Sequence, residues 1–117
     1  MRLVKQAEML TLPPGTLFAE LQQQWCFQDL AIKGETIIRD RKPSGFWEHS
    51  IAWPESDDET GTPFDRLDIM WNDPTASYPI ETAPTRHDCR EPETRYLVLE
   101  AADIDYLISV IRPGEQQ

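Results

Sequence analysis

Residues 95–112 constrain the fold more than any other stretch, because they carry the clearest hydrophobic periodicity in the chain. Tyr96-Leu97-Val98-Leu99 combines aromatic and β-branched residues, which favours a mostly buried strand. Pro113-Gly114 ends the segment that follows. In that segment apolar residues recur at i, i+3, i+4 and i+7, which predicts one face of an α-helix: Ile104, Leu107, Ile108 and Ile111. A helix this short is marginal alone in water, so we expect its apolar face to be buried against a sheet.

Four more strands are predicted upstream, at residues 16–21, 28–39, 46–53 and 64–71. Apolar and polar side chains alternate in the second of them, where Gly34 marks a bulge or bend. Residues 1–10 predict a helical turn, and Trp71 is expected in the core. These elements predict an α+β fold, with a small, mostly antiparallel twisted sheet of about five strands and a C-terminal amphipathic helix. A partly closed barrel is the alternative form of this sheet.

Residues 72–94 show neither helical nor strand periodicity and contain four prolines. Loops of this length without regular structure are uncommon in compact domains unless they are functional or mobile. We therefore predict an exposed loop at 72–94, within a single domain that spans residues 1–117. A short edge strand at residues 77–82 is the alternative.

The net charge of −10 is confined to one half of the chain. Six acidic residues balance six basic residues in 1–54, whereas fifteen acidic residues face five arginines in 55–117. Proteins hold nucleic acid through Lys and Arg, so direct binding to DNA or RNA is not expected. The acidic half is either a solvated surface that keeps the protein soluble or a face presented to a basic partner.

The two cysteines, Cys26 and Cys89, form neither a CxxC motif nor a paired framework. No signal peptide is recognisable at the start of the sequence, and no apolar run is long enough to span a membrane. We therefore expect a protein of the reducing cytoplasm of a host cell, with Cys26 in the core and Cys89 in a loop.

Motifs that would indicate an enzyme or a metal site are missing or incomplete. His87-Asp88-Cys89 is the only local group of metal-ligand type, whereas structural zinc sites show two close ligand pairs. A cysteine and a histidine indicate catalysis only with a third, orienting group, and pairs of acids arise by chance in a chain with 21 acidic residues. GxGxxG, GxxxxGK[ST], GxSxG and HExxH are absent from the sequence. We expect no metal, no cofactor and no enzymatic activity.

Four tryptophans are many for so short a chain. Trp25 stands at a predicted bend, and Trp47 and Trp53 belong to the strand before the most acidic turn. Protein interfaces concentrate Trp, Tyr and Arg at their centres, so Trp25 and Trp47 are candidate contact residues. Core packing is the alternative for each of them.

The opening of the chain resembles that of small uncharacterised acidic proteins encoded by tailed phages and prophages. The resemblance is carried by Leu12-Pro13-Pro14-Gly15-Thr16-Leu17-Phe18-Ala19 and by residues 25–35, WCFQDLAIKGE, and covers about the first third of the chain. It implies a phage-borne accessory protein of a kind that often binds host machinery. It implies no activity and no site residue.

Two functional hypotheses follow. In the first, the protein binds and inhibits a host protein that handles nucleic acid, such as a CRISPR effector subunit, through an acidic face that imitates phosphates. The contact residues would be Glu55, Asp57, Asp58, Glu59, Asp65, Asp68, Trp25 and Trp47. In the second, the chain is a structural or assembly accessory protein whose acidity serves only solubility. Salt separates the two, because a contact between acids and a basic groove weakens steeply with ionic strength.

Overall fold

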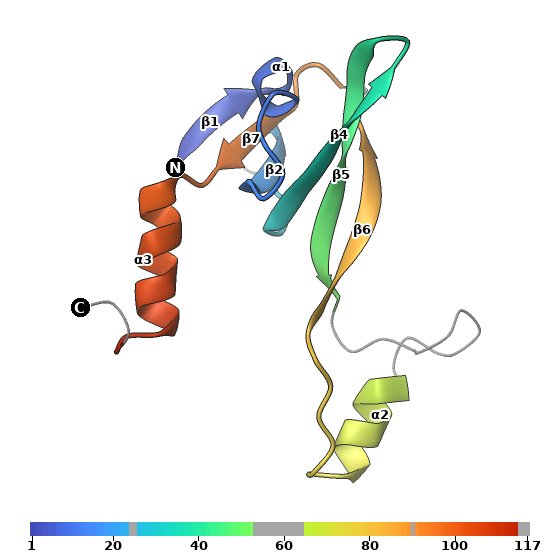
Figure 1. Cartoon of the computed structure of the whole chain (residues 1–117), viewed down its shortest axis with the longest axis vertical. Coiled ribbons are helices and arrows are strands. Elements are labelled where there is room, and N and C mark those ends of the chain that lie inside the picture. The colour runs from blue at the N-terminus through green and yellow to red at the C-terminus, as the bar shows by residue number, and fades with distance from the viewer. Residues whose placement is uncertain (24–25, 53–64, 90, 115–117) are drawn as a thin grey trace. The chain divides into compact units, whose positions relative to one another are not determined.

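A computed structural model of the chain describes residues 1–23, 26–52, 65–89 and 91–114. The chain divides into two compact units, of which residues 1–49 and 84–117 form the first and residues 50–83 the second. The elements follow one another as β1 (Arg2–Lys5), α1 (Gln6–Met9), β2 (Leu17–Gln23), β3 (Cys26–Phe27), β4 (Ala31–Arg39), β5 (Lys42–Ala52), α2 (Asp65–Asn72), β6 (Glu81–Asp88), β7 (Arg95–Val98) and α3 (Ala101–Ile111) (Figure 1).

The strands form one open sheet in the order β1-β7-β2-β4-β5-β6, and β3 pairs with β2 off this path. The pairs of β1 with β7 and of β2 with β3, β4 and β7 are antiparallel, as is β4 with β5. The predicted α+β class with a mostly antiparallel sheet is therefore confirmed. The barrel alternative is wrong, because β1 and β6 remain edges of an open sheet.

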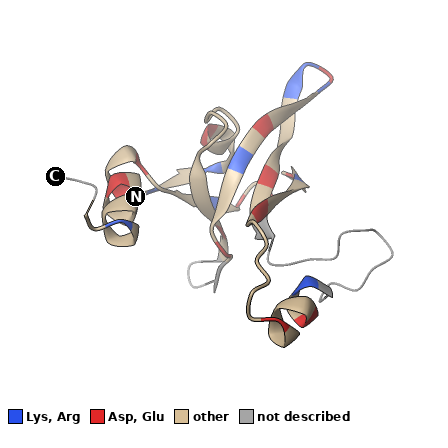
Figure 2. Cartoon of the chain, turned by 60° about the horizontal axis from the view of Figure 1, so that its bottom comes forward, with Lys and Arg blue, Asp and Glu red and all other residues tan. Residues whose placement is uncertain are grey.

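A tight hairpin joins β4 to β5. Arg39 pairs with Lys42, and the two residues between them, Asp40 and Arg41, have φ values of 52° and 65°. Positive φ at both central residues is the turn geometry that matches the right-handed twist of paired strands. The tip is charged, with both basic and acidic residues, as Figure 2 shows. The register shifts between Lys33 and Thr36, which confirms the bulge predicted at Gly34.

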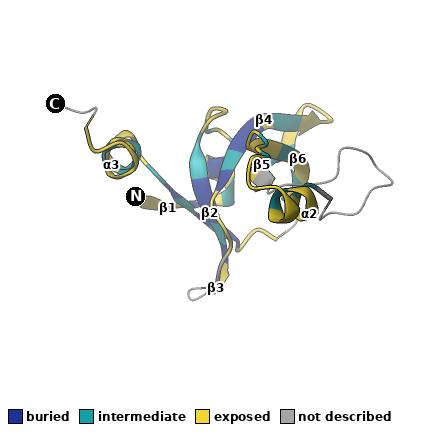
Figure 3. Ribbon diagram, turned by 90° about the horizontal axis from the view of Figure 1, so that it is seen from below, coloured by how far each residue is buried: buried dark blue, intermediate teal, exposed yellow. Residues whose placement is uncertain are grey.

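The hydrophobic core lies on one face of the sheet. Phe18, Phe46 and Tyr96 meet edge to face, with ring centroids 5.6 to 6.0 Å apart. Met9 of α1 is fully buried in the same cluster. Figure 3 shows that the buried residues are concentrated on the central strands. Lys33 is also buried here, with Nζ donating a hydrogen bond to Thr36 Oγ1 (2.8 Å) and lying 5.5 Å from the centre of the Phe46 ring. Its burial lowers the pKa of the ammonium group.

The C-terminal helix forms where the periodicity predicts it, but its apolar face is not buried. None of the residues of α3 is buried, and Tyr106 and Ile111 expose 67% and 73% of their surface. Figure 1 shows α3 leaving the sheet at the end of β7, beside the N-terminus. The expectation that Ile104, Leu107, Ile108 and Ile111 pack on the sheet is therefore wrong.

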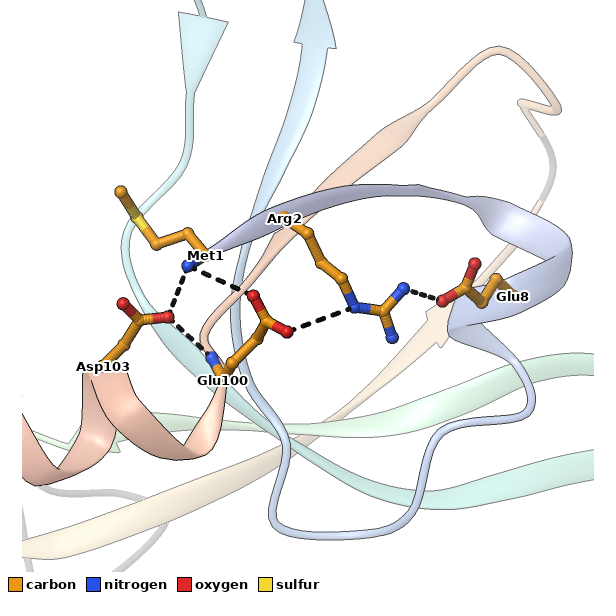
Figure 4. Close-up of polar contacts among 5 residues, drawn as sticks. All are labelled: Met1, Arg2, Glu8, Glu100 and Asp103. Atoms are coloured by element: carbon orange, nitrogen blue, oxygen red, sulfur yellow. Dashed lines mark hydrogen bonds and ion pairs between the residues drawn. The ribbon is translucent and has the colours of Figure 1, made fainter.

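Contacts at the first turn of α3 explain its direction. The Met1 amine lies 2.5 Å from Asp103 Oδ2, which also accepts a hydrogen bond from the Glu100 backbone N–H (2.8 Å). Arg2 pairs with Glu8 and lies 3.9 Å from the Glu100 carboxylate. This network, drawn in Figure 4, attaches the start of α3 to the edge strand β1 rather than to a face of the sheet.

Three other segments differ from their prediction. Residues 65–72 form helix α2 instead of a strand, and Trp71 is exposed instead of buried. Residues 81–88, expected in the loop at 72–94, form strand β6, so the shorter strand at 77–82 is also wrong. Pro84 is compatible with an edge strand, because residues that face away from the neighbouring strand have no ladder bond to donate. The N-terminal segment forms β1 before the short helix α1.

Within the part of the chain that the structure describes, no helix has the length and apolar character needed to cross a membrane.

Candidate functional site

His87 on β6 is the centre of a cluster built from four strands. Glu20 comes from β2, Glu48 from β5 and Tyr96 from β7, and Cys89 follows β6 directly. We call these five residues the His87 cluster. The sheet order brings them together although the members from β2, β5 and β7 are far from His87 in sequence.

The His87 ring is engaged at both nitrogens. Nδ1 lies 3.4 Å from a Glu48 carboxylate oxygen and 3.7 Å from a Glu20 carboxylate oxygen. Nε2 lies 3.0 Å from the Tyr96 hydroxyl, whose oxygen is 3.9 Å from Cys89 Sγ. The ring is also stacked on Phe46, with centroids 4.7 Å apart. The side chain is therefore fixed in position and orientation by four strands.

This environment keeps His87 protonated at neutral pH. A hydrogen bond with the Cys89 side chain and another with Glu48 raise its pKa from 6.5 to about 10, against the opposing effect of burial. Burial, reinforced by the nearby Cys89 side chain, raises the pKa of Tyr96. At neutral pH the cluster is thus an imidazolium with two glutamates at Nδ1 and a neutral tyrosine at Nε2.

A cavity of about 310 Å³ opens beside the cluster. Its lining includes Gln6, Glu20, His87, Cys89, Thr94 and Tyr96. The protonated His87 ring places a positive charge on the cavity wall, and Glu20 and Glu91 place negative charges there. The cavity is polar, and its lining is net acidic, because Glu20, Asp88 and Glu91 outnumber the cationic His87.

Protonation of His87 limits the chemistry that this ring can perform. A general base must be deprotonated near the working pH, whereas the pKa of His87 is about 10. Nδ1 faces two carboxylates, and the Tyr96 hydroxyl and the Cys89 side chain lie near the rest of the ring. Among the residues that the structure describes, no three His, Cys, Asp or Glu side chains are grouped as a metal ion would require. The arrangement forms an ion-paired link between strands.

The position of His87 depends on Gly45 of β5. A Cβ atom at Gly45 would lie 2.3 Å from the carbonyl oxygen of His87, which no side chain tolerates without a backbone shift. We expect Gly45→Ala to move β6 away from β5 and to lower the free energy of unfolding by about 1–3 kcal/mol. Urea denaturation measures this loss. Gly114→Ala is the matched control, because a Cβ atom at Gly114 meets nothing within 4 Å. Equal stability of the two variants would contradict the close approach of β5 and β6.

The structure describes only part of the predicted contact set. Asp65 is the first residue of α2, and Asp68 is exposed on the same helix. Trp47 is exposed on β5, on the side opposite Phe46. The remaining members lie outside the described residues, so their assignment stays a prediction: Trp25, Glu55, Asp57, Asp58 and Glu59.

Helix α2 carries an exposed patch that combines apolar and acidic side chains. Leu67, Asp68 and Trp71 stand at i, i+1 and i+4, which places them on neighbouring parts of one helix surface. Trp71 exposes 89% of its surface. We call these three residues the α2 patch. The opposite side holds Arg66, whose guanidinium lies 5.1 Å from the Tyr78 ring centre and 3.7 Å from a Glu81 carboxylate oxygen.

The sequence alone predicted neither the His87 cluster nor the α2 patch in full. His87 and Cys89 are recognisable as neighbours, but no local signal links them to Glu20, Glu48 or Tyr96. Leu67, Ile69 and Trp71 alternate as in a strand, and eight residues are too few for period alone to decide between strand and helix.

No protein-family model, curated protein or solved structure matches this chain.

Proposed function

We propose that this protein acts by binding another protein through the α2 patch, without catalysing a reaction. The observation that carries the proposal is the near-complete exposure of Trp71 next to Leu67, at a spacing of one helical turn. Tryptophan is enriched among the few residues that dominate binding energy at protein interfaces. An amphipathic helix that inserts such an anchor into a groove is a recurring mode of recognition.

The charge of the chain supports a partner with a basic surface. Asp65 and Asp68 belong to α2, and the second half of the chain holds the whole net charge of −10. Acidic groups around an apolar anchor attract a basic surface and speed association. We propose that the partner is a host protein that normally binds nucleic acid, and that this chain inhibits it by covering the basic surface, as an anti-CRISPR protein would. The resemblance of the opening residues to phage accessory proteins supports the same context.

A non-enzymatic role is supported by the His87 cluster. Its imidazolium is held in ion pairs with two carboxylates, those of Glu20 and Glu48. The cluster connects β2, β5, β6 and β7, which is a structural task.

Two substitutions in the α2 patch test the proposal. Proteins are captured from a host lysate on immobilised parent chain, and the dissociation constant of each purified candidate is then measured by calorimetry. We expect Trp71→Ala to weaken binding by about tenfold or more, because a buried aromatic anchor contributes about 2 kcal/mol or more. We expect Asp68→Lys to weaken binding mainly at low salt, because the charge acts through long-range attraction.

Tyr106→Ala is the matched control, because it removes an exposed aromatic residue from α3 instead of α2. It should leave the dissociation constant unchanged. A partner that binds Trp71→Ala as tightly as the parent would refute the role of the α2 patch. In that event reversal of Asp57, Asp58 and Glu59 to Lys tests the predicted acidic turn directly.

A structural or assembly role is the second candidate, and the exposed apolar helix α3 is the observation that favours it.

A further inference from the structure

The geometry points to a reciprocal dimer of this chain, in which α3 of each copy packs on the outer sheet face of the other. The outer sheet face is the side opposite the Phe18–Phe46–Tyr96 core. Its apolar residues are the buried Ala19 and Leu21 and the more accessible Leu3, Leu17, Ile32, Trp47 and Leu97. This contact is separate from the α2 patch, which lies on a different helix.

Helix α3 has the composition of a buried helix. After Asp105 its residues are Tyr106, Leu107, Ile108, Ser109, Val110 and Ile111, so apolar side chains point in nearly every direction. Val110 and Ile111 expose more than half of their surface, as does Tyr106. A soluble protein seldom leaves such a surface uncovered, so α3 indicates an interface.

The strand register defines the outer sheet face. Leu3 is opposite Leu97, Leu97 is opposite Ala19, and Leu17 is opposite Ile32, so these side chains share one side of β1, β7, β2 and β4. Trp47 joins them through β5, because it alternates with the buried Phe46 and precedes His49, the register partner of Ile32, by two residues. Leu3 exposes 57% of its surface, and Leu17, Ile32 and Leu97 are half-buried. The face is therefore a second apolar layer, which is buried at Ala19 and Leu21 and open to solvent most at Leu3 and Trp47.

The chain does not cover this face with its own helix. The Met1 amine, Arg2, Glu100 and Asp103 attach the first turn of α3 to β1, and α3 continues away from the sheet. Both α3 and the outer sheet face thus expose apolar side chains, and the two surfaces do not contact each other within one copy. A second copy supplies both at once, because a two-fold axis repeats each contact and doubles the buried area.

Charges fit the same arrangement. On β1 and β7 the outer sheet face carries two cations, Lys5 and Arg95, which stand directly opposite each other in the register. Arg95 also contacts Glu93 of its own chain, with Nη2 3.8 Å from a carboxylate oxygen, so Lys5 is the cation most in need of an incoming carboxylate. The exposed charge within α3 is the carboxylate of Asp105. Adjacent like charges on paired strands repel, and an incoming carboxylate relieves that repulsion.

Sedimentation equilibrium of the full chain tests the dimer, with Val110→Asp and Leu3→Asp as the two interface variants. Each places a charge at a position that is exposed in the single chain, so folding is preserved while the contact gains a buried, unpaired carboxylate. We expect a parent dimer and a dissociation constant raised by at least about tenfold in each variant. Trp71→Ala is the control and should dimerise as the parent does.

A mixture of the two variants separates this dimer from others. Val110→Asp retains an intact outer face and Leu3→Asp an intact helix, so the mixture keeps one of the two reciprocal contacts and should associate more tightly than either variant alone. Raised salt should strengthen the dimer, because it screens the repulsion between two chains of charge −10. Binding of a basic partner weakens with salt instead, so failure of the dimer and failure of the proposed function give different results.

Three outcomes overturn the inference. If the parent chain stays monomeric over a wide concentration range, the dimer is wrong, and the exposed side of α3 would have to bind a different protein. A Leu3→Asp variant that dimerises like the parent indicates a contact between helices alone. A Val110→Asp variant that dimerises like the parent excludes α3 from the interface.

Discussion

Replacement of Phe46 by alanine is expected to lower the free energy of unfolding by about 3–5 kcal/mol. Phe46 is fully buried and contacts Phe18 and Tyr96 edge to face, with centroids 5.6 and 6.0 Å away. Its ring also carries His87 on one side and lies near the Lys33 ammonium. Truncation leaves a cavity in the core and removes the aromatic ring that contacts the His87 imidazolium and lies near the Lys33 ammonium. Urea denaturation followed by fluorescence measures the loss.

A loss this large is a sizeable part of the stability of a small domain, so the alanine variant can fall below the threshold for folding. Phe46→Leu keeps most of the buried volume and is expected to lose clearly less stability while remaining folded. Trp71→Ala removes an aromatic side chain that is 89% exposed and lies outside α3, so it serves as the surface control. A Phe46→Ala variant within about 1 kcal/mol of the parent would contradict the position of this ring at the centre of the core.

The second large effect concerns pH. The pKa of His87 in the fold, about 10, lies above its ordinary value of 6.5. The protonated ring therefore stabilises the fold fully below about pH 6.5, and this contribution disappears as the pH rises to about 10. Each tenfold change in proton affinity is worth about 1.4 kcal/mol. We expect the parent to lose on the order of 2–4 kcal/mol over this range from His87, after allowance for the part of the ring that water reaches.

His87→Gln isolates this contribution. The variant should be less stable than the parent at low pH, and the difference between the two should shrink as the pH rises from 6.5 to 10. Comparison with the parent is needed because Lys33 acts in the opposite direction: burial lowers the pKa of its ammonium group, so its cost is relieved as the pH rises. The raised pKa of Tyr96 adds a loss of stability only above about pH 10.

His49→Gln is the matched control, since His49 is the other histidine of the chain and does not belong to the His87 cluster. It should keep the pH-dependent loss of the parent. Glu48→Gln should reduce that loss, because it removes one carboxylate that faces the imidazolium. If the stability difference between parent and His87→Gln stays constant from pH 6 to pH 10, His87 is not held as an imidazolium.

The sequence alone was sufficient for elements whose signal is local. The bounds of α3 follow from its 3.6-residue period and from Pro113-Gly114, and β7 follows from four consecutive apolar or aromatic residues. The bulge in β4 follows from Gly34, which interrupts an alternating strand. Each of these features depends on backbone and side-chain preferences within a few residues, so it needs no knowledge of distant partners.

Tertiary structure decided the features that depend on long-range pairing. Pro84 argues against a strand until β6 is known to lie at an edge, where residues that face away from the neighbouring strand have no ladder bond to donate. The His87 cluster exists because the sheet order places β2, β5, β6 and β7 around one ring, and nothing local in the sequence encodes that order. The direction of α3 depends on ion pairs between residues about one hundred positions apart, such as Met1 and Asp103. Period shows which side of a helix is apolar, whereas only the tertiary contacts at its first turn determine whether its own sheet covers that side.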